Sequence, residues 1–208
     1  MDTAFLITAF VTLFVIIDPI GMTPLFVALT QGMGAERRRV IAIRACVTAA
    51  LLLILFAALG EAVLAFVGIS MPAFRIAGGM LLFLTALDML FERRSQRRKG
   101  QADAAEEDDG VDPSVFPLAI PLIAGPGSIA TVILLAGQKP GLEGLALVVG
   151  VMLSLILLVF LMFLMGSLLE RALGHVGINV VTRLLGMLLA ALAVQFVLDG
   201  LRGFGLAG

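Results

Sequence analysis

Tryptophan and tyrosine are absent from the sequence, and cysteine and histidine occur once each. A single cysteine, Cys46, permits no internal disulfide and no cysteine-based metal site. Charged residues make up only 14% of the chain and the formal net charge is −1, which argues against a nucleic-acid partner. No His, Cys, Asp and Glu cluster has metal-ligand spacing, and no nucleophile motif or phosphate loop occurs. We therefore expect neither an enzyme nor a bound cofactor or metal.

Most of the chain is apolar. Apolar residues make up 61% of the 208 residues, and the mean hydropathy is +1.13, far outside the range of soluble domains. The sequence therefore predicts an all-α, polytopic membrane protein whose main partner is the lipid bilayer. The first apolar run has no basic segment before it and no small-residue cleavage site, so we expect it to remain in the protein rather than be removed as a signal peptide.

Six hydrophobic runs have the roughly 20 residues that about 30 Å of hydrocarbon requires. They lie at about 4–30, 41–67, 72–91, 114–136, 144–169 and 177–201.

Basic residues concentrate in the odd-numbered connections between these runs. Arg37, Arg38 and Arg39 lie in the first connection, five basic residues between 93 and 99 lie in the third, and Arg171 lies in the fifth. The positive-inside rule places these connections in the cytoplasm and both termini outside. The third connection, 92–113, runs from basic to acidic. Its simplest interpretation is a solvated linker, and contact of its basic half with lipid headgroups is the alternative.

The first run contains residues that an ordinary lipid-facing helix does not tolerate. These are Asp18, Pro19, Gly21, Thr23 and Pro24. Prolines remove backbone donors and glycine eases a non-helical conformation, so we expect the helix to break here, buried against protein or lining a wet cavity. A carboxylate at bilayer depth is a functional-site candidate by default.

The fourth run contains a second interruption. Pro117 and Pro121 precede Gly125, Pro126, Gly127 and Ser128. We expect one half-helix to end here and another to begin, with Ser128 near the new N-terminus, where unpaired N–H groups attract anions.

The two halves of the chain match each other. Asp18 falls on Gly125 at an offset of 107, and the Arg-x-x-Gly of Arg75 and Gly78 falls on that of Arg183 and Gly186 at 108. Three runs per half make the second half enter the membrane from the opposite side. The sequence therefore predicts two inverted three-helix repeats, 1–91 and 114–208, with helices 1 and 4 broken. A purely structural duplication is the alternative.

The repeat suggests a ligand. Backbone N–H groups near Ser128 suit a carboxylate, while Asp18 suits an ammonium or a coupling cation, H⁺ or Na⁺, so together they fit a zwitterion. Two helix caps without a ligand would have the same sequence.

Other polar or small residues in the spans have structural explanations beside functional ones. Arg75 and Arg183 either snorkel to the interface or pair with a broken helix, and Asp88 meets headgroups or Arg93. Gln195 and Thr85 are expected to be buried and to bond between helices, whereas Gly78 and Gly186 allow close helix packing. A homodimer through a glycine-rich face is possible.

Three stretches resemble the MarC family of bacterial and archaeal inner-membrane proteins. They are IDPIGMTPLF at 17–26, FRIAGG at 74–79 and PLAIPLIAGPGSI at 117–129. The resemblance covers essentially the whole chain and implies a six-span architecture similar to that of LysE-type exporters. It also implies transport of small neutral amino acids such as glycine and alanine, the activity assigned to one member.

The resulting hypothesis is a secondary transporter that moves a small neutral amino acid by alternating access around the two broken helices. The rivals are a membrane component that transports nothing and docks a partner, and a transporter of an inorganic ion.

Overall fold

The computed structural model describes residues 3–94, 96–98, 100 and 112–206, and this part of the chain contains helices and no strands. The helices are α1 (Thr3–Ile17), α2 (Pro19–Leu29), α3 (Ala35–Val67), α4 (Met71–Leu90), η1 (Ser114–Ile123), α6 (Pro126–Gln138), α7 (Leu142–Leu164) and α8 (Gly166–Gly203).

Among the described residues, five helical segments are long and apolar enough to cross a membrane, and six if the bent pair η1 and α6 is one span. They lie within a few residues of the predicted runs, so the prediction of an all-α membrane protein is confirmed. The arrangement as two inverted repeats with functional broken helices stays a prediction.

The largest differences from the predicted boundaries lie in α3, α7 and α8. The helix α3 begins at Ala35, so the three arginines of the first connection form its first turns rather than a loop. Acidic Glu36 in the first turn suits the positive end of the helix dipole. The helix α7 ends at Leu164, short of residue 169, and α8 is interrupted at Gly174, where φ is 61°.

The segment formed by α1 and α2 is more buried than the other long helices. In its most apolar stretch 56% of the residues are buried, against 28–33% in the other long helices. Two cores lie on either side of it: α3, α6 and α7 contribute to the larger, and α4 and α8 to the smaller. The Phe26 ring of α2 stacks on Phe163 of α7 with 4.4 Å between centroids. The interruption at Asp18 is thus held inside the protein, as an interrupted helix in a bilayer requires.

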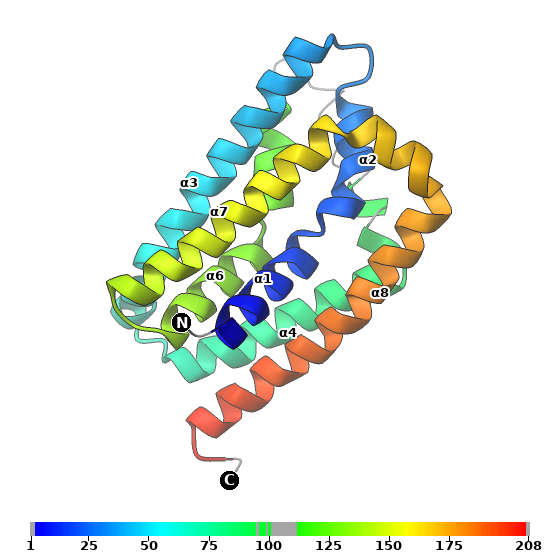
Figure 1. Cartoon of the computed structure of the whole chain (residues 1–208). Helices are drawn as coiled ribbons and strands as arrows, with labels where there is room; N and C mark the ends of the chain where they lie inside the picture. Colours follow the sequence, from blue (N-terminus) through cyan, green and yellow to red (C-terminus); the bar gives the residue numbers. More distant parts are fainter. Residues whose placement is uncertain (1–2, 95, 99, 101–111, 207–208) are drawn as a thin grey trace.

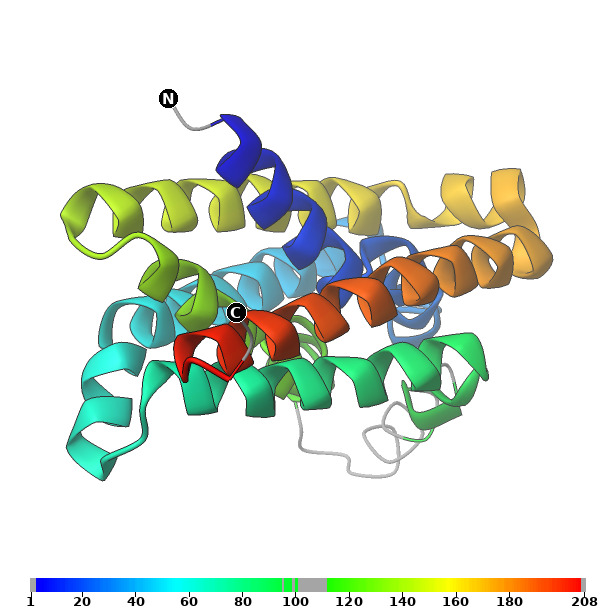
Figure 2. The same cartoon turned by 90° about the horizontal axis from the view of Figure 1, so that it is seen from below.

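The helices α4 and α8 run antiparallel and side by side over most of their lengths (Figures 1 and 2). Glycines set this close approach. A Cβ on Gly79 would lie 2.7 Å from the Ala193 carbonyl oxygen, and one on Gly186 would lie 2.9 Å from the Cβ of Met89. Gly78 faces Leu134 of α6 instead. The packing explanation of Gly78 and Gly186 is sufficient for both residues.

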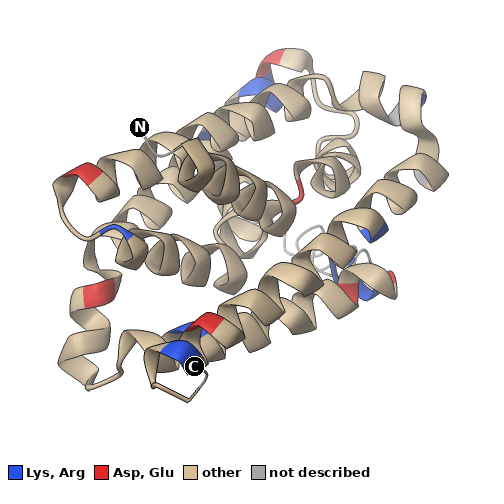
Figure 3. Cartoon of the chain, turned by 60° about the horizontal axis from the view of Figure 1, so that its bottom comes forward, with Lys and Arg blue, Asp and Glu red and all other residues tan. Residues whose placement is uncertain are grey.

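Charged residues lie mainly near the helix ends, with long uncharged stretches between them (Figure 3). The start of α1 and the end of α8 lie at the same end of the molecule as the α3–α4 and α6–α7 connections (Figure 1). At the start of η1, Asp112 accepts hydrogen bonds from the Ser114 backbone and hydroxyl and pairs with Arg44 of α3 at 3.1 Å. The Ser114 hydroxyl holds the pKa of Asp112 below its ordinary value.

Candidate functional site

The first interruption is centred on Asp18, between α1 and α2. Asp18 adopts a left-handed conformation with φ 56° and ψ 66°, and its Oδ1 accepts from the Gly21 N–H at 3.0 Å. Pro19 follows as the first residue of α2, where a missing N–H is tolerated. Asp18 is therefore an N-cap that lets a new helix start in the middle of the span.

Gly21 has a different role from the one expected. The non-helical residue is Asp18, whereas Gly21 lies inside α2. A Cβ on Gly21 would lie 2.2 Å from Oδ2 and 2.8 Å from Cγ of Asp18. The glycine therefore leaves room for the carboxylate rather than relaxing the backbone.

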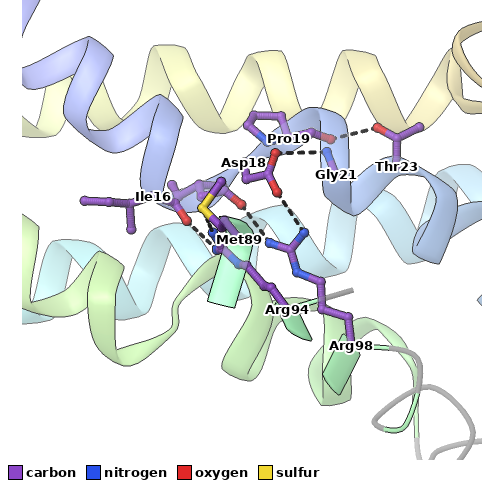
Figure 4. A network of polar contacts seen from close by, with 9 residues as sticks. Ile16, Asp18, Pro19, Gly21, Thr23, Met89, Arg94 and Arg98 are labelled. Atoms are coloured by element: carbon purple, nitrogen blue, oxygen red, sulfur yellow. Dashed lines mark hydrogen bonds and ion pairs between the residues drawn. The ribbon is translucent and has the colours of Figure 1, made fainter. Parts of the chain in front are cut away.

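The interruption leaves carbonyl groups at the end of α1 without helical partners, and two arginines bind them (Figure 4). Arg94 Nη2 donates to the Ile16 carbonyl, and Arg98 Nη2 donates to the Ile17 carbonyl at 3.3 Å. Both arginines lie in the short helical turns that follow α4. Cationic groups are favourable at a helix C-terminus because the dipole is negative there.

Arg98 also neutralises Asp18. Its Nη1 lies 3.0 Å from Asp18 Oδ2, and the side chains are 6% and 0% exposed. Burial lowers the pKa of Arg98, and the charge of Asp18 together with its hydrogen bond opposes that shift. Because the ordinary pKa of a guanidinium lies so far above neutrality, the two groups form a buried ion pair.

The second interruption lies between η1 and α6, which meet at an angle of 53°. Phe116 and Ile120 have extended conformations inside η1, and the peptide bonds that follow them are cis. Gly125 is the N-cap of α6, and a Cβ there would lie 2.3 Å from the Pro121 carbonyl oxygen. Ser128 lies in the first turn of α6, 3% exposed, as the sequence predicts.

The two interruptions meet. A Cβ on Gly127 would lie 3.4 Å from Ile16, which is two residues before Asp18. A cavity of about 140 Å³ lies at this junction. It is lined by Ile16, Thr85, Arg94, Arg97, Arg98 and the α6 N-terminus from Gly125 to Ser128.

A larger cavity of about 750 Å³ lies beside α2. Its wall includes Gly21 and Pro24, the 30–33 connection, Arg38 of α3, Glu92 and Asn179. Arg98 lines both cavities, so its side chain stands between the larger space and the smaller one.

Asp88 and Arg183 have partners other than those expected. Asp88 pairs with Arg97 at 2.7 Å, not with Arg93. Arg183 pairs with Glu92 at 2.7 Å, at the end of α4, rather than with an interrupted helix.

The polar residues predicted to bond between helices do not do so. Gln195 is exposed and donates to Asp199 one turn along α8, so the expected interhelical bond is wrong. Thr85 donates to the Leu81 carbonyl of its own helix. Thr23, predicted as a site residue and not as an interhelical bond, donates to the Pro19 carbonyl within α2. The Nε of Arg75 is buried and has no hydrogen-bond partner among the described residues, so it does not bond to either interruption.

Sequence reasoning missed Arg94 and Arg98. They belong to the basic half of 92–113, which it interprets as solvated, yet Arg98 is 5% exposed. The acidic half, 106–109, lies outside the described residues. A signal existed: a buried carboxylate needs a cation, and five basic residues follow the third span. Nothing in that run distinguishes the two that turn inward.

Comparisons with known proteins agree on one family. The model of MarC family integral membrane proteins matches residues 3–204. A UPF0056 membrane protein of Aquifex aeolicus is 40% identical over 200 residues, covering 94% of this chain and 92% of its own. The UPF0056 inner membrane protein YhgN of Escherichia coli is 39% identical, covering 95% and 96%, and YvbG of Bacillus subtilis is 36% identical, covering 98% and 97%. No solved structure matches the chain.

Proposed function

Because the chain belongs to the MarC family of integral membrane proteins and buries an ion pair where two interrupted spans meet, we propose that it is a secondary transporter of the cytoplasmic membrane. Its substrate is a small neutral amino acid of the glycine or alanine type. The observation that carries the proposal is the cavity at the junction, with the Asp18–Arg98 pair on one side and the free N-terminus of α6 on the other. Ionisable groups at membrane depth occur chiefly along solute pathways.

The packing of the helices supports the inverted repeat behind this mechanism. Each span of the first half contacts its predicted counterpart in the second: α1 contacts α6, α3 contacts α7, and α4 contacts α8. Transporters with inverted repeats bind substrate where the two repeats meet, near the midplane, and move one repeat against the other. The junction of the two interruptions is formed by one span from each predicted repeat, which supports a substrate site there.

Arg98 gives the cycle a resting state. Its guanidinium occupies the position beside Asp18 that a substrate ammonium would take. Binding of the ammonium then requires Arg98 to leave Asp18, and Arg98 lies between the large cavity and the small one. The exchange of one cation for another keeps Asp18 neutralised throughout, which avoids an unpaired charge in a low dielectric. The large cavity lies beside the arginine-rich start of α3, so under the positive-inside rule it is the proposed cytoplasmic entrance.

Uptake of labelled alanine and glycine into proteoliposomes tests the proposal, with imposed proton and sodium gradients applied separately. Wild type is compared with Asp18→Asn and Gly127→Leu, which fills the junction. Gly150→Ala is the matched control, because a Cβ there meets nothing within 4 Å. We expect uptake that follows one gradient, persists in the control and is lost in both site variants. Absence of uptake by folded, inserted wild-type protein would overturn amino-acid transport.

A further inference from the structure

The small cavity at the junction carries more positive charge than its carboxylates balance. Three guanidinium groups line it. Arg98 pairs with Asp18 at 3.0 Å, and Arg97 pairs with Asp88 at 2.7 Å. Arg94 donates to two neutral acceptors, the Ile16 carbonyl and the Met89 sulfur. Within the described part of the chain, Arg94 thus has no carboxylate partner. The three guanidinium groups therefore share two carboxylates, Asp18 and Asp88, and this excess of positive charge favours an anion in the cavity.

The N-terminus of α6 adds donors to the same space. The first intrahelical hydrogen bond at this end runs from the Ile129 N–H to the Gly125 carbonyl, at 2.9 Å. The N–H groups of Gly127 and Ser128 precede it and are free of the helical ladder. The Ser128 hydroxyl is a second, independent sign. It lines the cavity, its residue is only 3% exposed, and it has no hydrogen-bond partner among the described residues. The residue is buried while its hydroxyl has no protein partner, so this hydroxyl is available to a ligand in the cavity.

The volume limits the size of the missing partner. A cavity of about 140 Å³ compares with the engineered cavity of about 150 Å³ that admits benzene, a ligand of six carbon atoms. The number of non-hydrogen atoms does not exceed that of benzene in acetate, propionate, glycine or alanine. Gluconate has more than twice as many non-hydrogen atoms and exceeds this volume, so it would have to extend out of the cavity.

We propose that this cavity is a binding site for a small monocarboxylate group, held by Arg94, the Ser128 hydroxyl and the first N–H groups of α6. The inference rests on the proposed function in placing the substrate carboxylate here, and it goes further on substrate class. The carboxylate is the required group and the ammonium is dispensable, because Asp18 already has a cation in Arg98. The site therefore accepts monocarboxylates that have no amino group as well as small neutral amino acids.

The test is the thermal unfolding midpoint of the full chain, purified in a nonionic detergent, with sodium salts at equal ionic strength. The probes are propionate, alanine and alaninamide, which keeps the ammonium and lacks the carboxylate. Gluconate is the size control, and inorganic phosphate is run separately to detect a site for oxyanions in general. A ligand that binds only the folded state raises the midpoint in a concentration-dependent way.

We expect propionate and alanine to raise the midpoint, and alaninamide and gluconate to leave it unchanged. Arg94→Gln should weaken propionate binding by roughly 10- to 100-fold, since hydrogen bonds to charged groups are the strong ones. Ser128→Ala should weaken it less, and Arg202→Gln, which changes an exposed arginine in the last turn of α8, should retain it. If Arg94→Gln fails to fold, Arg94→Lys and Ser128→Ala provide the same comparison.

Stabilisation by alaninamide but not by propionate would overturn the proposal, and so would stabilisation by phosphate alone or unchanged affinity in both Arg94→Gln and Ser128→Ala. These outcomes are separate from failure of transport. If propionate binding depends on Arg94 but the protein moves no solute, the transport proposal is wrong and the binding-site proposal stands.

Discussion

Asp18 uses its two carboxylate oxygens in two different interactions. Its Oδ1 caps α2 and its Oδ2 holds Arg98, and Gly21 leaves the space that both require. Loss of Oδ1 would leave the Gly21 N–H without an acceptor. Loss of Oδ2 would leave the Arg98 guanidinium without its ion-pair partner. Substitutions at this residue and its contacts should therefore change stability, and under the proposed function transport as well.

Gly21→Ala should destabilise the protein by about 1–3 kcal/mol, because the added methyl group overlaps the Asp18 carboxylate. Unfolding in detergent mixtures of increasing dodecyl sulfate content measures the loss. Gly150→Ala is the control and should be neutral or slightly stabilising, since alanine is the better helix former and no atom lies near. Equal stability of the two variants would mean that the carboxylate does not lie over Gly21.

The Asp18–Arg98 pair should behave as one unit. Each of Asp18→Asn and Arg98→Gln should cost about 3–5 kcal/mol, because either change leaves a polar or charged partner buried. The double variant should cost less than the sum of the singles, with a coupling of about 0.5–3 kcal/mol in the same unfolding assay. Strict additivity would show that the two side chains do not meet in the membrane.

At the scale of elements, the contact between α4 and α8 depends on where their glycines point. Gly79 faces backbone atoms of α8, which cannot move without moving the helix. Gly78, its neighbour, faces the end of the Leu134 side chain at 3.0 Å, and that side chain can rotate. Adjacent glycines in one sequence motif thus tolerate a side chain to different degrees.

Gly79→Ala should therefore destabilise by about 1–3 kcal/mol, and Gly78→Ala by much less. The difference between the two variants is the measured quantity, taken from unfolding curves of both proteins in the same detergent. A larger loss for Gly78→Ala would place α4 in a different rotation about its axis.

Helix existence and order could be predicted from the sequence, since apolar runs of this length have few alternatives in a bilayer. The break at Asp18 is also predictable from the sequence, because proline and a carboxylate are local signals. The partner of Asp18 was not, because Arg98 lies 80 residues away in a basic run whose members look alike. For Gln195 the sequence predicts too much burial, because a polar residue in an apolar run suggests a buried position. In the structure Gln195 lies on the exposed side of its helix and donates to Asp199.

At the scale of the whole molecule, the positive-inside rule predicts cytoplasmic odd-numbered connections. Impermeant thiol labelling in intact cells tests this in a Cys46→Ala background. Leu142→Cys, at an exposed position after the α6–α7 connection, should be labelled, and Arg37→Cys at the start of α3 should be labelled only after the membrane is opened. The reverse pattern would invert the orientation and make the large cavity face outward.

The separation of Asp18 and Arg98 along the chain also bears on how the protein is made. The ribosome completes Arg98 80 residues after Asp18, about 4–16 s later at roughly 5–20 residues per second. During that interval the first span carries a carboxylate whose guanidinium has not yet been synthesised. An unpaired carboxylate is costly at bilayer depth, so we expect this helix to stay beside water or protein until the third connection emerges and the first half of the chain is complete.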